Sequence, residues 1–277
     1  RRSSDLRRGA GPAGVGHSPA APCYLPLEVD EPRAPAASRP GALPVVGKAD
    51  AARSRAMPSR ARPDLAPLLA SQSAESLADL LVQAGGSPSA ARSAAGKVVT
   101  HAFGKGAIRP ETVVWDRATV AGLGIGGWAH EALLALDARP SLTVQSVAPA
   151  SDGTERLLMR ARDEALLETV IIPVPRGDAG PARVTVCISS QVGCARACTF
   201  CETGAHGLSR QLDAGEIVDQ VRLARARNAE QRRDPITNVV FMGMGEPLDN
   251  LAEVLKAAAL LTDGRAFRLA PSRVTVS

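Results

Sequence analysis

The sequence lacks several features that would define other classes of protein. No run of about 18 apolar residues occurs, so nothing is long enough to span a bilayer. The charged start leads into no apolar segment of the signal-peptide type. Only five cysteines are present and four of them are clustered, which argues against a disulfide framework and for a reducing cytoplasm. We therefore expect a cytoplasmic protein with no membrane partner.

Aromatic residues are also scarce, and the positive charge is not spread evenly along the chain. Only 3% of the residues are aromatic, which gives little support for a base-stacking platform. Residues 1–70 hold 11 Lys and Arg and 6 Asp and Glu; subtracting these from the chain totals of 33 and 28 leaves 22 of each sign. The net charge of +5 therefore comes entirely from the first 70 residues. Bulk basicity is no evidence that the rest of the chain binds nucleic acid.

The composition divides the chain into four segments. Residues 1–70 are rich in Ala, Pro, Arg, Gly and Ser and should be disordered, with Cys23 as an incidental thiol. Residues 73–140 predict a small helical domain that starts at the N-cap Ser73. Its helices are expected at about 73–84, 88–103, 112–123 and 128–136.

The pattern becomes strand-like in residues 141–182, where a hairpin and a third strand over 166–172, stopping at Pro173, are expected. Residues 183–277 then alternate strand, helix, strand, helix, strand, which predicts a parallel α/β layout. Its strands are expected at 183–189, 236–242 and 273–277, with helices starting at Asp213 and near 251. The fold class is therefore α/β, preceded by the helical domain.

A cysteine-rich loop follows the first of these parallel strands. Cys194, Cys198 and Cys201 have the spacing C-x3-C-x-F-C. Three thiolates in one short loop can hold three irons of a four-iron cluster and leave the fourth open for a ligand. The alternatives are coincidence or a zinc knuckle, in which His206 completes a Cys3His set. The position between a buried strand and a capped helix favours the cluster, because active-site loops occupy that position in α/β folds.

A second glycine-rich segment, G-M-G-E-P over residues 243–247, follows the next strand. Glycine lets a ligand approach the backbone closely, and the carboxylate of Glu246 can hold an ammonium group. Because both loops follow parallel strands, we expect them at the same end of the sheet.

These motifs resemble those of the RlmN/Cfr family of radical S-adenosylmethionine (SAM) RNA adenine methyltransferases. The segments S-S-Q-V-G-C-x3-C-x-F-C-x-T-G and M-G-M-G-E-P-L carry the resemblance. It covers about residues 74–277 and is strongest from Leu166 onward. The resemblance implies a partial (βα) radical-SAM barrel, and it implies that the helical domain helps to engage RNA.

The resemblance also implies cofactor-binding roles. Cys194, Cys198 and Cys201 would be ligands of a [4Fe-4S] cluster. SAM contacts would come from Gly245 and Glu246 and from Ser277, the last residue of V-T-V-S.

Two further residues would act on the substrate if the resemblance holds. Cys187 matches the catalytic cysteine that resolves the enzyme–RNA adduct. Glu168, in E-T-V-I-I-P, matches a proton acceptor, although the segment between it and Cys187 is longer than in the family. A strand-face carboxylate and a buried apolar thiol are the structural alternatives.

In the family, a methyl group carried on a late cysteine is transferred by radical chemistry to an adenine ring carbon. The implied partners are 23S rRNA, tRNA and an external, flavodoxin-like electron donor. No cysteine follows Cys201 here, so the resemblance implies an incomplete chain that holds the first half of the barrel.

M-G-M-G-E-P-L favours the branch that methylates C2, as in RlmN, whereas C-E-T-G-x2-G-L also resembles the C8-methylating Cfr branch. A non-catalytic fragment that binds RNA and holds zinc or a cluster is the third alternative.

Overall fold

The computed structural model describes residues 69–104, 115–175, 180 and 182–277. The prediction of a disordered tail, with Cys23, falls almost wholly outside these residues. Part of the expected helix over 112–123 and part of the loop after Pro175 fall outside them as well. Among the described residues, no helix is long and apolar enough to cross a membrane.

Short helices form the first part of the described chain. Ser73 caps α1 by accepting a hydrogen bond from Ser76 N at 3.0 Å, and Ser87 precedes a proline at the start of α2. Asp116 caps α3, which therefore starts at Arg117 rather than at 112. The elements are η1 (Leu69–Ser71), α1 (Ala74–Gln83), α2 (Pro88–Phe103), α3 (Arg117–Gly122), η3 (Gly127–Ala129) and α4 (His130–Leu134).

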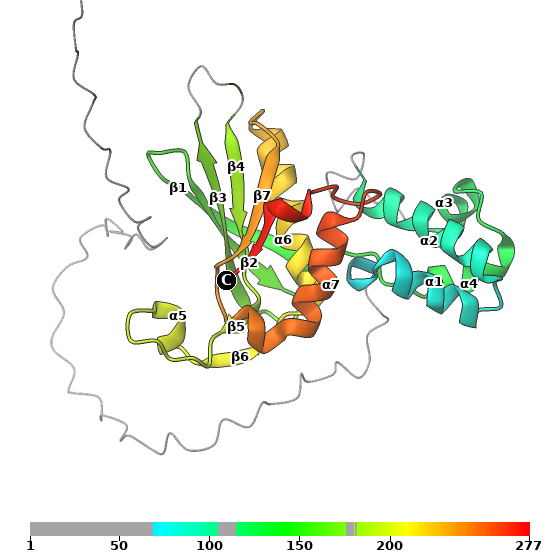
Figure 1. Ribbon diagram of the computed structural model, residues 1–277, viewed down its shortest axis with the longest axis horizontal. Coiled ribbons are helices and arrows are strands. Elements are labelled where there is room, and N and C mark those ends of the chain that lie inside the picture. Colours follow the sequence, from blue (N-terminus) through cyan, green and yellow to red (C-terminus); the bar gives the residue numbers. More distant parts are fainter. Residues whose placement is uncertain (1–68, 105–114, 176–179, 181) are drawn as a thin grey trace, which may run out of the picture. The chain divides into compact units, whose positions relative to one another are not determined.

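One six-stranded sheet, ordered β1-β2-β3-β4-β7-β8, runs through the rest of the chain (Figure 1). Its first four strands pair antiparallel, and β4, β7 and β8 pair parallel. The strands are β1 (Leu142–Pro149), β2 (Glu155–Ala161), β3 (Leu166–Val174), β4 (Arg183–Cys187), β7 (Ile236–Phe241) and β8 (Val274–Val276). The predicted hairpin and the parallel alternation are both confirmed.

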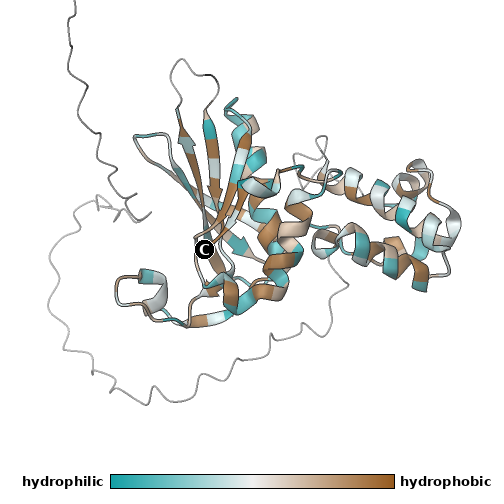
Figure 2. Cartoon of the chain, viewed as in Figure 1, coloured by the Kyte–Doolittle hydropathy of each residue, from teal (hydrophilic) through white to brown (hydrophobic). Residues whose placement is uncertain are grey.

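Two helices connect the parallel strands, and they lie on the same side of the sheet in Figure 1. They are α6 (Ala214–Glu230) and α7 (Leu251–Thr262), with η5 (Pro247–Asn250) before α7 and η6 (Pro271–Arg273) before β8. The predicted capping box at the start of α6 is present, since Asp213 accepts from Glu216 N and Glu216 accepts from Asp213 N. In Figure 2, hydrophobic residues follow the central strands and α7.

The structure corrects the expected strand bounds: β7 ends at Phe241 and β8 covers Val274–Val276, and the larger differences are at β3 and β4. β3 does not stop at Pro173, which pairs with Val184 in the antiparallel ladder. A proline lacks only the N–H donor, so it can lie in a strand where no partner needs that donor. Strand β4 ends at Cys187, although Ile188 N still donates to Val240 O at 2.9 Å.

A second, two-stranded sheet was not anticipated from the sequence. It pairs β5 (Gln191–Gly193) with β6 (Leu208–Gln211), and the short helix α5 (Glu202–Ala205) lies between them. Strands of three and four residues are too short for a periodic pattern to show.

The buried residues of the helical part and of the sheet form one hydrophobic core. Phe103 of α2 lies with its ring centroid 5.9 Å from that of Phe267, and the Arg222 guanidinium lies 5.3 Å from the Phe103 ring centroid. The α6-facing side of β3 is fully buried at Leu167, Thr169 and Ile171. Alternation along the strand therefore places Glu168 and Val170 on the opposite face.

Candidate active site

The cysteine loop and the G-M-G-E-P turn meet beyond the ends of β4 and β7. These strands are parallel neighbours, with Cys187 in register with Val240. Beyond them, Gly243 N donates to Ile188 O at 3.0 Å, and Ser190 N donates to Met244 O at 2.9 Å. The prediction that both loops share one end of the sheet is confirmed.

The β5–β6 hairpin closes the base of the cysteine loop. Cys194 N donates to Gly207 O at 3.0 Å, which joins the two ends of the loop. Gly193, at a φ of +76°, lies so close to this carbonyl that a Cβ atom there would overlap Gly207 O. Only glycine combines that backbone angle with that approach, so the closed base depends on its identity.

The three loop thiols are held on a short, turned backbone. Cys201 N donates to Cys198 O at 3.0 Å, and Ala197 between the first two thiols has a φ of +48°. Cys194 is buried, Cys198 is exposed and Cys201 is half-buried, and no disulfide joins the described cysteines. The three sulfur donors of the loop thus range from buried to solvent-exposed.

The zinc alternative requires His206 to join these thiols. Instead, its Nε2 lies 3.4 Å from Glu202 Oε1, and both side chains are more than two-thirds exposed. Over the described part of the chain, no group of three or more His, Cys, Asp or Glu side chains is arranged around a single metal ion.

The G-M-G-E-P turn is fastened to Gln191 of β5. Gln191 Oε1 accepts a hydrogen bond from Glu246 N at 2.8 Å. Gly245 has a φ of +102°, and a Cβ atom there would lie 2.6 Å from Gln191 Cβ. The glycine is therefore required by its backbone angle and by the packing of Gln191, before any ligand is considered. Glu246 Oε1 accepts from Leu248 N at 3.0 Å, which fixes the orientation of the carboxylate.

A buried polar network that the sequence reasoning missed supports both loops. Ser189 Oγ donates to Glu168 O at 2.6 Å and accepts from Met244 N at 2.9 Å. Gln220 of α6 accepts from Ser189 N and from Thr169 Oγ1, at 2.7 and 2.8 Å. A glutamine among the apolar residues of a buried helix face was the available signal, because buried amides are retained when they are hydrogen-bonded.

Glu168 and Cys187 lie on the same face of the sheet, away from α6. Val170 is in register with Cys187, and Glu168 is two residues from Val170. The Glu168 carboxylate pairs with Arg156 Nη1 at 3.1 Å, and both side chains are 36% exposed. Cys187 is only 2% exposed.

Ser277 follows β8, the third parallel strand. Thr275 of β8 is in register with Val240, so Ser277 lies beyond the same end of the sheet as the two loops. Ser277 is exposed. The positions that the sequence singled out for the cluster and for SAM thus follow three neighbouring strands, β4, β7 and β8.

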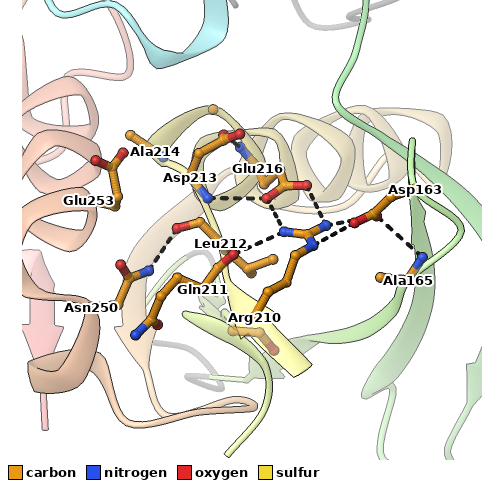
Figure 3. Close-up of polar contacts among 12 residues, drawn as sticks. Asp163, Ala165, Arg210, Gln211, Leu212, Asp213, Ala214, Glu216, Asn250 and Glu253 are labelled. Atoms are coloured by element: carbon orange, nitrogen blue, oxygen red, sulfur yellow. Dashed lines mark hydrogen bonds and ion pairs between the residues drawn. The ribbon is translucent and has the colours of Figure 1, made fainter. Parts of the chain in front are cut away.

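The return strand of the cysteine loop is anchored by Arg210, as Figure 3 shows. Its guanidinium pairs with Glu216 at 2.7 Å and with Asp163 at 2.6 Å. Burial is the largest influence and lowers the pKa of Arg210, but the bonds to Glu216 and Asp163 outweigh it and raise that pKa overall. In the same view, Asn250 donates to Leu212 O at 2.7 Å, joining β6 to the turn before α7.

Comparison with known proteins identifies the class of this region. The Radical SAM superfamily model matches residues 188–276, which contain the cysteine loop, the G-M-G-E-P turn and β8. The crystal structure of a radical SAM methyltransferase from Sphaerobacter thermophilus superposes with a TM-score of 0.59 and 32% sequence identity. The match covers 76% of this chain and 56% of that one. The α/β radical-SAM fold is confirmed.

Sequence relatives narrow the class. A protein named "Probable RNA methyltransferase" from Sorangium cellulosum is 64% identical over 211 residues, 76% of this chain and 51% of that protein. A "Dual-specificity RNA methyltransferase RlmN" from Nitratidesulfovibrio vulgaris is 48% identical over 136 residues, 48% of this chain and 37% of that protein. The chain thus spans about half the length, or less, of these relatives. Over the aligned residues the chain is similar to proteins named RNA methyltransferase and RlmN, and the RlmN/Cfr resemblance seen in the motifs is supported.

The radical SAM superfamily implies a [4Fe-4S] cluster and SAM as cofactors. The donor set fits the cluster, because it consists of three thiols on one loop without a disulfide among them. The backbone fits as well: the sharp turn at Ala197 and the closed base at Gly193 hold these thiols on one compact loop. The neighbouring Glu246 carboxylate offers an acceptor for a cationic ligand group.

Proposed function

We propose that this chain is the part of an RlmN-type radical SAM RNA methyltransferase that binds the cofactors, and that the enzyme methylates C2 of an adenine in 23S rRNA and in tRNA. One observation carries the proposal: the segment that leads into the three-thiol loop, residues 188–191, is hydrogen-bonded to the G-M-G-E-P turn beyond two neighbouring parallel strands. The RNA methyltransferase names of the relatives support the substrate class.

Cys194, Cys198 and Cys201 would hold the cluster, and Gly245, Glu246 and Ser277 would hold SAM. Bound together and reduced, the cluster and SAM supply a radical that can activate an unreactive C–H bond. The chain's own contribution is to orient the Glu246 carboxylate, whose Oε1 is fixed by Leu248 N at 3.0 Å. Gln191 keeps the Glu246 backbone within hydrogen-bond distance of β5. An external, flavodoxin-like protein would supply the electron.

Cys187 and Glu168 are proposed as the residues that act on the RNA. Cys187 would be the thiol that releases the covalent RNA adduct, and Glu168 the carboxylate that accepts a proton. Their shared face of the sheet supports a joint role. The Arg156 guanidinium, 3.1 Å from Glu168 Oε1, holds the carboxylate at this face of the sheet. Because Cys187 is 2% exposed, its thiol would react only with a substrate inserted against this face.

Anaerobic reconstitution with iron and sulfide tests the cofactor assignment. We expect a brown protein with about four irons per chain and broad visible absorption. Replacing Cys198 with Ala should abolish iron binding, whereas replacing Cys187 with Ala should leave the iron content unchanged. A protein that takes one equivalent of zinc and no iron would contradict the proposal.

The position of methylation is tested separately, on the protein produced from the whole gene. Unmethylated 23S rRNA and tRNA are incubated with the enzyme, SAM and a reductant, and the digested nucleosides are separated by mass spectrometry. We expect 2-methyladenosine. Recovery of 8-methyladenosine would instead support the Cfr-type alternative, and iron binding without any methylated product would support the non-catalytic one.

A further inference from the structure

The tip of the cysteine loop is tied to η5, the short helix at the end of the G-M-G-E-P turn, by an ion pair that the quoted motifs do not include. Arg196 lies between the first two loop thiols, and its Nε donates to Asp249 Oδ2 at 2.8 Å. Its Nη2 donates to the other carboxylate oxygen, Oδ1, so the pair is bidentate. Asp249 lies in η5, three residues after Glu246. A bidentate pair fixes the orientation of both groups as well as their distance.

This pair, which we call the outer clamp, continues inward through two glutamines. Gln211 of β6 donates from Nε2 to Asp249 O at 2.9 Å, and its Oε1 accepts from Gln191 Nε2 at 2.8 Å. Gln191 Oε1 in turn accepts from Glu246 N. One polar path therefore runs from the loop tip, through both strands of the hairpin, to the backbone of Glu246.

Arg196 also contacts one of the thiols directly. Its backbone N lies 3.5 Å from Cys194 Sγ and donates to it. The residue whose side chain binds Asp249 thus carries the N–H that meets a cluster-ligand sulfur. Hydrogen bonds to sulfur help to set the reduction potential of iron–sulfur clusters. A shift of the Arg196 side chain would therefore be felt at Cys194.

Because the outer clamp is exposed, it can position the loop without contributing much to the stability of the fold. The Arg196 side chain is 55% exposed and that of Asp249 is 31% exposed. Ion pairs exposed to this extent contribute little to folding, because water screens the charges. The pair can still restrict where the loop tip lies, because the hydrogen bonds of the β5–β6 hairpin hold the base of the loop and not its tip.

We propose that Arg196 and Asp249 are positioning residues that hold the three thiols in register with the Glu246 carboxylate. The inference rests on the proposed function, in which the thiols hold the cluster and Glu246 holds SAM. Loss of the clamp should loosen the loop tip, so that iron is released faster and SAM binds more weakly.

The test uses the iron-loaded protein and a double-mutant cycle. The variants are Arg196→Ala, Asp249→Ala, the double variant, and the exchange Arg196→Asp with Asp249→Arg. Iron release to a chelator, the Kd for SAM and the electron paramagnetic resonance of the reduced cluster are measured for each. Each single variant should release iron about three- to fivefold faster and bind SAM more weakly by a similar factor. The double variant should be no worse than either single one, and the exchange should recover part of the loss.

Arg160→Ala is the matched control. Arg160 pairs with Glu164 at 2.6 Å with side-chain exposures of 43% and 72%, and among the described residues neither side chain is hydrogen-bonded to the cysteine loop or to the G-M-G-E-P turn. It should leave iron release, SAM binding and the resonance spectrum unchanged.

The outcomes separate this inference from the function on which it rests. If the unaltered protein holds iron and binds SAM but the clamp variants behave like Arg160→Ala, the inference is wrong and the proposed function stands. Single effects that add in the double variant would also overturn it, because the two residues would then act independently. If the unaltered protein takes up neither iron nor SAM, both the proposed function and the inference fail.

Discussion

Arg210 and Arg196 both tie the cysteine loop to the rest of the chain, but their surroundings differ. Arg210 lies on the return strand β6, with a side chain that is 19% exposed and a Glu216 partner that is 1% exposed. Arg196 lies at the loop tip, where its side chain is 55% exposed. The base of the loop is therefore built into the core, whereas its tip is held at the surface.

This difference separates two tasks within one loop. A buried ion pair cannot lose one partner without leaving a charge stranded in a poorly solvated place. An exposed pair can open at little cost, because water replaces the lost partner. The base thus secures the fold, whereas the contact at the tip can open at little cost in stability.

The largest expected effect is at the base. Arg210→Met should lower the free energy of unfolding by about 3 kcal/mol, because the buried Glu216 carboxylate loses its cation. Chemical denaturation monitored by circular dichroism measures the change. Arg160→Met, at an exposed pair, is the control and should cost below about 1 kcal/mol. Equal costs at the two sites would show that burial does not distinguish the base from the surface.

A second buried carboxylate, Glu155, tests whether burial of an ion pair is enough to give a stability loss of this size. Glu155 starts β2, is 3% exposed in its side chain, and pairs with Arg227 and Arg233 at 2.9 and 3.2 Å. It lies away from the cysteine loop, so Glu155→Gln should lower stability by about 2–3 kcal/mol without changing iron content.

The same substitution has a predictable pH dependence. The hydrogen bonds from Arg227, and then the charges of Arg227 and Arg233, lower the pKa of Glu155 below its ordinary value of 4.5 against the opposing effect of burial. A depressed folded-state pKa contributes stability that is fully present above 4.5 and is lost as the pH falls through the lower folded value. The stability difference between the unaltered protein and Glu155→Gln should therefore shrink as the pH falls below 4.5. A constant difference would show that the pair is not ionic.

A smaller effect is expected at the turn that the loop contacts. Gly245→Ala combines a φ of +102° with a Cβ atom 2.6 Å from Gln191, and should cost about 2–3 kcal/mol. Gly85→Ala is the matched control, because it shares a positive φ of +95° but would meet no atom within 4 Å. It should cost about 1 kcal/mol. Only Gly245→Ala should weaken SAM binding. A similar loss of SAM binding in both variants would show that the turn at Gly245 has no particular role in holding SAM.

The contrast between base and tip also shows what the sequence could predict. The strand–helix alternation, the Asp213 capping box and the common sheet end of the two loops follow from local patterns. Those patterns have periods of two or 3.6 residues, and they extend over enough positions to be recognised.

The contacts that fasten the loop could not be predicted in the same way. Arg196 meets Asp249 from 53 positions away, and Arg210 meets Asp163 from 47. An arginine in a loop carries no local sign of its partner, since the pairing depends on how distant segments fold together. The end of β3 was predicted wrongly at Pro173 for a related reason, because its partner in the sheet, Val184, lies 11 positions further along the chain.

The last test changes no residue and compares the reactivity of the exposed and the buried thiols. Cys198 is exposed and Cys201 half-buried, whereas Cys194 and Cys187 are buried. In the iron-free protein, limited alkylation followed by peptide mass spectrometry should modify Cys198 first and Cys187 last, since reaction requires access to the thiolate. Loading with iron should then protect the three loop thiols, while the slow labelling of Cys187 stays unchanged because it holds no iron in the proposed arrangement. Protection of Cys187 on loading would place it among the cluster ligands, so that a residue of β4 would bind the cofactor instead of facing the substrate.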